Sequence, residues 1–151
     1  MSEHLSNADF LAVMSEMFDR DQQIRFTPTG RSMLPMLDGK HDTVTLARPS
    51  ERLAKYDVAF YQRANGQLVL HRVVGLEGEN GYIFSGDGQY TYEHGITDDN
   101  ILALMVRFTH GGKEHTVRDF SYRLYIRRMM IKKRLRIFAL RVYHKFFKRK
   151  K

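Results

Sequence analysis

The chain contains no cysteine, and this absence excludes several kinds of site. A disulfide framework, a thiol nucleophile and a cysteine-ligated zinc site all need that residue. Proline occurs only three times and no low-complexity stretch is present, which argues against long linkers. The longest unbroken apolar run covers residues 101–106, far short of the ~20 residues that a membrane-spanning helix needs.

Metal and cofactor sites also lack their usual sequence patterns. The seven histidines are scattered, and none has a partner at the spacing of a metal site. No glycine-rich loop of the phosphate-binding type is found. We therefore expect no metal and no cofactor. We also expect one domain, since 42% of the 151 residues are hydrophobic and can form a core.

Acidic residues are missing from the C-terminal segment. Residues 1–120 contain 12 Lys and Arg and all 17 Asp and Glu, a net charge of −5. Residues 121–151 contain 13 Lys and Arg and no acid, a net charge of +13. The mildly acidic body and the strongly basic end therefore need separate explanations.

Hydrophobic periodicity divides the chain into three parts. In residues 1–23, apolar side chains recur at three- and four-residue spacing and predict an amphipathic helix that begins near Ser6 or Asn7. Residues 24–118 contain short runs rich in β-branched and aromatic residues and predict about six or seven strands. The strands expected from the clearest runs are 43–47, 57–62, 67–75, 81–86 and 101–108. A further alternating run, IRFTPT, precedes Gly30, and HGG at 110–112 followed by KEHTV predicts another hairpin. Residues 119–151 predict a basic amphipathic helix. The expected fold is mainly β, a small antiparallel domain between two helices.

One serine, Ser32, lies between Gly30 and Pro35 in the segment GRSMLP. Glycine allows a backbone bend and proline stops a helix, so the serine is expected on a turn. On such a turn, neighbouring backbone N–H groups can face a developing oxyanion. Serine alone is a weak nucleophile, so catalysis needs a base within hydrogen-bond reach. The same pattern also fits an ordinary turn serine.

His71 is the candidate base. It lies in LVLHRVVG, where strand alternation places it on the face opposite Arg72. A neutral imidazole can accept the proton of a serine hydroxyl near neutral pH. The alternative is a half-buried, hydrogen-bonded histidine with a structural role. For Arg72 we expect a structural ion pair with a carboxylate.

Five segments in order give this pair a context. GRSMLPML (30–37) resembles the Ser-Met-x-Pro-x-Leu box of type I signal peptidases and their relatives, which include the self-cleaving SOS repressors. The segments DTV (42–44), KYDVAFY (55–61), HRVVG (71–75) and SGDGQ (85–89) resemble the boxes that follow it. The fourth box holds the general base, which is lysine in bacterial signal peptidases and histidine in the endoplasmic-reticulum and archaeal-like branch.

Four positions depart from the family pattern. Lys40 and His41 are inserted before the second box, Tyr56 replaces a glycine, and Gly88 replaces an asparagine. The usual N-terminal membrane anchor and the large extra β region of the bacterial enzymes are not seen in the sequence. The resemblance is therefore closer to compact signal-peptidase-like proteins of anaerobic bacteria.

The resemblance implies a serine endopeptidase that cleaves a peptide or a precursor protein. Ser32 matches the nucleophile of the family and His71 matches its general base. Gly30, Met33 and Pro35 belong to the box around the nucleophile and are expected to contact the substrate. The alternative is a module of the same fold that binds a peptide or a membrane without catalysis.

The acid that orients the histidine is less well defined by the sequence. Asp87 in the last box is the first candidate to orient His71. In the histidine branch this acid often follows several residues later, so Glu93, Asp98 and Asp99 are alternatives. An aspartate that satisfies backbone N–H groups in a turn is a further interpretation of Asp87.

Residues 121–151 have three interpretations. The apolar stripe with basic flanks fits a helix on an anionic membrane surface, which we favour. Packing of the stripe on the β domain comes second. Binding of nucleic acid comes third, because no recognisable nucleic-acid-reading module is present. The N-terminus does not resemble a signal peptide, so we expect a cytoplasmic protein, peripheral on the inner face of the membrane.

Overall fold

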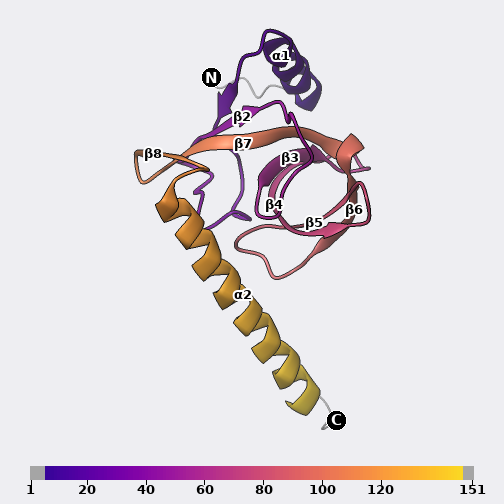
Figure 1. Cartoon of the computed structure of the whole chain (residues 1–151), viewed down its shortest axis with the longest axis vertical. Helices are drawn as coiled ribbons and strands as arrows, with labels where there is room; N and C mark the ends of the chain where they lie inside the picture. Colours follow the sequence, from indigo (N-terminus) through magenta and orange to yellow (C-terminus); the bar gives the residue numbers. More distant parts are fainter. Residues whose placement is uncertain (1–5, 148–151) are drawn as a thin grey trace. The chain divides into compact units, whose positions relative to one another are not determined.

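A computed structural model describes residues 6–147 of the chain (Figure 1). The chain divides into two compact units, residues 1–116 and residues 117–151, and each is considered by itself. The elements of the first unit are α1 (Asn7–Asp19), β1 (Ile24–Phe26), β2 (Val44–Ala47), β3 (Val58–Gln62), β4 (Leu68–Glu77), β5 (Gly81–Ser85), β6 (Glu93–Thr97), the short 3₁₀ helix η1 (Asp98–Asn100), β7 (Ile101–His110) and β8 (Lys113–Thr116). The second unit contains the helix α2 (Phe120–Phe147).

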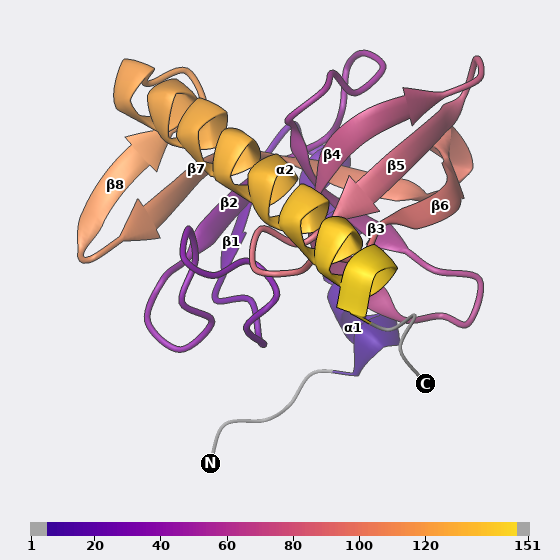
Figure 2. The same ribbon diagram turned by 90° about the horizontal axis from the view of Figure 1, so that it is seen from below.

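The strands of the first unit form one antiparallel sheet. Their order is β1-β2-β7-β3-β4-β5-β6, and β8 pairs with β7. The β7–β8 hairpin and the adjacent strands β4 and β5 are visible in Figure 2. This architecture confirms the predicted mainly β fold with a helix at each end of the described chain.

One strand was not predicted from the sequence. β6 covers Glu93–Thr97, and its apolar content is limited to Ile96, with Gly95 beside it. A glycine inside a short polar run weakens the strand pattern. The strand forms because β5 supplies pairing partners, with Tyr82 opposite Ile96. Strand pairing of this kind depends on tertiary context that periodicity does not capture.

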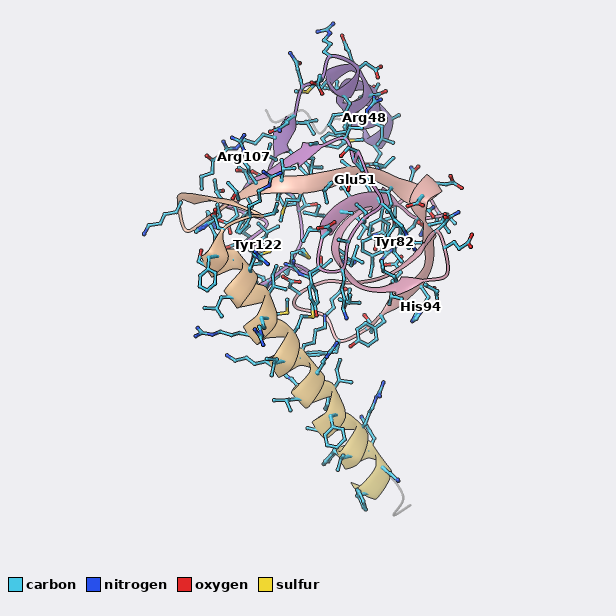
Figure 3. All side chains as sticks on the ribbon, in the orientation of Figure 1. Arg48, Glu51, Tyr82, His94, Arg107 and Tyr122 are labelled. Carbon is cyan, nitrogen blue, oxygen red and sulfur yellow. The ribbon has the colours of Figure 1, made fainter. Side chains whose placement is uncertain are left out.

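A cluster of aromatic and aliphatic side chains fills the interior around which β3, β4, β5 and β6 curl (Figure 1). Tyr82 points into this interior (Figure 3). Tyr61 stacks on Phe84 with a centroid separation of 4.4 Å. Burial of such large apolar surfaces is the main source of stability in a small domain. The cluster therefore fixes β3 and β4, the two strands that carry most of the candidate site.

The N-terminal helix is capped and packed on the sheet. The Ser6 hydroxyl accepts a hydrogen bond from the backbone N–H of Asp9 at 3.1 Å, so Ser6 is the N-cap of α1. Phe10 packs edge-on against Phe26 of β1 and Phe60 of β3, at centroid distances of 5.2 and 5.8 Å. Through these contacts α1 packs on the sheet of its own unit.

The second unit is a single long helix. α2 has 28 residues, and Phe120–Phe147 contains no acidic residue. Across residues 6–147, none of the helices combines the length and the apolar character required to cross a bilayer.

Candidate functional site

Ser32 lies on a turn, as the sequence predicted. Residues 32–36 form consecutive turns between β1 and β2. The backbone N–H of Leu34 donates to the carbonyl of Arg31 at 3.2 Å, and that of Leu37 donates to the carbonyl of Met33 at 3.0 Å. Gly30 before the turn has a φ of 100°, a conformation that favours glycine.

Buried apolar side chains hold the serine turn in place. Met33, Met36 and Leu37 are buried, while Ser32 is partly exposed. The second, fifth and sixth residues of the segment 32–37 are the buried anchors, and the serine is its first residue. The turn is thus a rigid support that presents the serine at the surface of the core.

A second loop packs directly against the serine turn. The backbone N–H of Gly88 donates to the carbonyl oxygen of Ser32 at 2.9 Å. A Cβ atom at Gly86 would overlap this same carbonyl oxygen, and a Cβ at Gly88 would lie 2.9 Å from the carbonyl oxygen of Leu34. Both positions therefore need glycine for close backbone approach. Gly88, which departs from the family pattern, fits the contact that this chain makes.

Asp87 is bound by Arg72. The guanidinium Nε and Nη2 of Arg72 donate to the two carboxylate oxygens of Asp87, each at 2.7 Å, and both side chains are fully buried. Arg72 also donates to the carbonyl oxygen of Tyr56 at 2.8 Å. The structural ion pair expected for Arg72 is therefore present. It ties the loop that contains Asp87 to β4 and to the segment before β3.

This pairing changes the interpretation of Asp87. Neighbouring residues of a strand point to opposite faces, so Arg72 and His71 leave β4 on opposite sides. The contacts of Asp87 with Arg72 place its carboxylate on the Arg72 side. They give Asp87 a structural role in holding its loop to β4, and its role as the acid that orients the histidine stays a prediction.

His71 is buried and contacts Tyr61. The Tyr61 hydroxyl oxygen lies 3.3 Å from Nδ1 of His71, and the Tyr61 hydroxyl donates to Glu93 Oε2 at 2.8 Å. Because the Tyr61 hydroxyl uses its proton in the hydrogen bond to Glu93, its oxygen accepts a hydrogen bond from the histidine. This arrangement places the ring proton of neutral His71 on Nδ1 and leaves the lone pair on Nε2.

Arg63 holds the carboxylate of Glu93, the residue to which Tyr61 donates its hydrogen bond. Its Nε and Nη2 donate to the two carboxylate oxygens of Glu93, each at 2.6 Å. This bidentate pair holds the pKa of Glu93 below its ordinary value, so Glu93 is ionised near neutral pH. Burial, reinforced by the hydrogen bond to Glu93, raises the pKa of Tyr61, which therefore remains a protonated donor.

The other acids considered from the sequence have different positions. Asp98 accepts a hydrogen bond from the Tyr82 hydroxyl, and Asp99 is exposed in η1. The contacts of Glu93 lead to the histidine through Tyr61. We define the positioning chain as His71, Tyr61, Glu93 and Arg63.

Sequence reasoning missed Tyr61 and Arg63. The register of β3 against β4 would have identified Tyr61 as a neighbour of the histidine. Ala59 of β3 is opposite His71 of β4, and Tyr61 is opposite Val69. Tyr61 is therefore a diagonal neighbour of His71, within reach of a long side chain. Arg63 follows two residues later, directly after β3. The register had to be known before Tyr61 could be identified in this way.

Ser32 and His71 line the same cleft, although they come from separate segments. The cleft has a volume of about 270 Å³. Its wall includes Gly30 and Met33, two of the residues expected to contact a substrate. Pro35 is exposed and is not among the described residues of the wall. Within residues 6–147, no group of histidine and acidic side chains is arranged to hold a metal ion.

Comparison of the chain with protein-family models, curated proteins and solved structures gave no match. The chemistry of the cleft therefore has to be inferred from its own residues. They provide a hydroxyl on a rigid turn, a histidine whose ring orientation is fixed, and an ionised carboxylate one side chain further away. A hydroxyl and an oriented imidazole in one cleft are the components of acyl transfer.

Proposed function

We propose that the protein is a serine endopeptidase in which Ser32 is the nucleophile and His71 is the general base. One observation carries this proposal: Ser32 and His71 line one cleft. The contact of His71 Nδ1 with Tyr61 supports it. The resemblance of five segments to type I signal peptidases supports the same assignment.

In the proposed reaction, the Ser32 oxygen attacks the carbonyl carbon of a peptide bond while Nε2 of His71 takes the hydroxyl proton. Backbone N–H groups beside the serine stabilise the negative charge on the carbonyl oxygen. The tetrahedral species then loses the amine, which receives the proton from His71. Water, deprotonated by His71, releases the peptide acid and regenerates the serine.

The positioning chain has two effects in this scheme. The Tyr61 hydroxyl oxygen accepts a hydrogen bond from Nδ1–H of His71 and thereby favours the tautomer that has its lone pair on Nε2. The carboxylate of Glu93 stabilises the positive imidazolium that forms when His71 accepts the serine proton. We assign the orienting role to Glu93 acting through Tyr61, and we assign Asp87 to structure.

The substrate that fits this cleft is a peptide or an exposed segment of a precursor protein. The residues that line the wall include the apolar residues Met33, Val69 and Leu70 and the amide residues Gln67 and Gln89. Such a wall can hold an apolar side chain and hydrogen-bond a peptide backbone. We place the reaction in the cytoplasm, since the absence of cysteine fits a reducing compartment.

The test compares new protein N-termini in cells that carry the native chain or the Ser32→Ala variant. The matched control is Ser50→Ala, because Ser50 is exposed and lies outside the cleft wall. We expect a set of N-termini in the native and Ser50→Ala cells that is missing in the Ser32→Ala cells. Identical sets, with all three proteins folded and expressed, would favour the alternative of a binding module without catalysis.

A further inference from the structure

The surface of α2 is apolar along one line and basic on both sides of it. The helix has 28 residues and is about 42 Å long at the usual rise per residue. We define the α2 stripe as the apolar side chains that recur along this line, namely Leu124, Ile131, Leu135, Phe138, Val142 and Phe146. Each of them is at least 36% exposed.

The spacing of these residues places them on one face. Steps of three, four and seven residues bring side chains back to the same side of a helix. Exposure of a continuous apolar line of this length is unusual for a helix that faces only water. The α2 stripe therefore indicates a surface that is covered in the functional state.

Basic side chains border the α2 stripe on both sides. At 3.6 residues per turn, Arg128 and Lys132 project along one border, and Arg127, Arg134 and Arg141 project along the other. These side chains are exposed. The absence of any acid in Phe120–Phe147 means that the helix carries no charge of its own to offset them.

Charge and shape together select the partner. We propose that α2 binds parallel to the surface of an anionic lipid membrane, with the α2 stripe among the acyl chains and the basic borders at the headgroup phosphates. An apolar line flanked by lysine and arginine matches this interface in both layers. A nucleic acid would engage the basic borders but would leave the apolar line without a partner. The proposal is independent of catalysis by Ser32.

The absence of tryptophan from the chain makes a clean test available. Phe138→Trp places a single fluorophore on the α2 stripe, and Leu76→Trp places one on an exposed apolar position of β4 as the matched control. Emission spectra of the full chain are recorded with vesicles of phosphatidylcholine alone and with vesicles that contain phosphatidylglycerol. A tryptophan that enters acyl chains shifts its emission to shorter wavelength.

We expect a blue shift for Phe138→Trp with phosphatidylglycerol vesicles only, reduced at high salt because screening weakens attraction to the headgroups. The control Leu76→Trp should not shift. The proposal is overturned if Phe138→Trp does not shift, shifts equally with neutral vesicles, or shifts no more than the control. A blue shift of Phe138→Trp with duplex DNA and not with vesicles would overturn the membrane proposal in favour of nucleic-acid binding.

A second pair of variants tests the α2 stripe without a fluorophore. Ile131→Ser combined with Leu135→Ser removes two exposed apolar side chains from the stripe, and Val13→Ser combined with Leu76→Ser removes two exposed apolar side chains elsewhere. Cosedimentation with phosphatidylglycerol vesicles should weaken at least about tenfold for the first pair and remain unchanged for the second. Equal binding by both pairs would show that the apolar line does not enter the membrane.

Discussion

The two units of the chain use basic residues in opposite ways. In the first unit, Arg72 and Arg63 each bind a carboxylate through two hydrogen bonds and fix the geometry around the cleft. In the second unit, the basic residues of α2 are accompanied by no acid within the helix. Arginine bound to a carboxylate produces a defined site, whereas a helix whose own charges all have one sign presents a surface suited to a large charged partner.

The first unit also contains both extremes of ion pairing. Arg72 and Asp87 are fully buried, while the pair between Arg48 and Asp19 has both side chains more than half exposed. Removal of one partner from a buried pair leaves an uncompensated charge in the interior. An exposed partner that is left alone is solvated instead. The effect of a substitution should therefore follow burial rather than hydrogen-bond length.

The largest effect is expected from Asp87→Ala. It leaves the buried guanidinium of Arg72 without its carboxylate and should lower the free energy of unfolding by about 3–5 kcal/mol. The control Asp19→Ala breaks the exposed pair and should lower it by less than about 1 kcal/mol. Urea unfolding of both variants measures the difference. Similar losses in the two variants would contradict the distinction between buried and exposed pairs.

A smaller effect, on catalysis, is expected from Tyr61→Phe. The ring retains its stacking on Phe84, but the hydroxyl that links His71 to Glu93 is lost. We expect kcat to fall by about tenfold or more, with KM little changed, because the tautomer and orientation of the base are no longer fixed.

Tyr82→Phe is the matched control for this substitution. Tyr82 is also buried and its hydroxyl also donates a hydrogen bond to an acid, Asp98, but its other partner is the backbone N–H of Leu53 and not the histidine. Its loss should cost stability and leave kcat unchanged. If the two tyrosine variants lose activity equally, the positioning chain has no specific role.

The smallest effect is the pH dependence of stability that arises from Glu93. Because Arg63 lowers the pKa of Glu93 in the folded chain, this pair stabilises the fold above the carboxyl's ordinary pKa of 4.5, and the contribution is lost as the pH falls through the lowered value. Both side chains remain partly exposed, so the contribution should be below about 1 kcal/mol.

Thermal unfolding of the native chain and of Glu93→Gln across this pH range measures the contribution. The difference between them should be present at neutral pH and disappear in acid. Arg63→Gln should show the same dependence, since it removes the other partner of the pair. A difference that is independent of pH would mean that Glu93 contributes through packing and not through its charge.

Local patterns were sufficient to predict much of the fold. Alternating β-branched and aromatic residues correctly indicated β3, β4, β5 and β7, and the bend at Ser32 followed from glycine and proline. These features depend on neighbours in the sequence. β6 was not predicted, because its stability comes from pairing with β5 and not from its own sequence pattern.

In the candidate site, too, some residues could be identified from local sequence and others depended on contacts between distant segments. Ser32 and His71 were identified from short segments, and the structure places both on one cleft. The partner of the histidine could not be predicted, because its identity depends on the register of β3 against β4 and on where Glu93 begins β6. Asp87 was favoured by its place in the last box, but the sequence could not reveal that Arg72 binds it.

The role of Ser32 is tested most directly by incubating the purified full chain with a library of peptides and identifying the cleaved bonds by mass spectrometry. We expect cleavage by the native chain and by Ser50→Ala, and none by Ser32→Ala or His71→Ala. Circular dichroism confirms that all four proteins are folded. Cleavage of the same bonds by folded Ser32→Ala would contradict the central claim that Ser32 is the nucleophile.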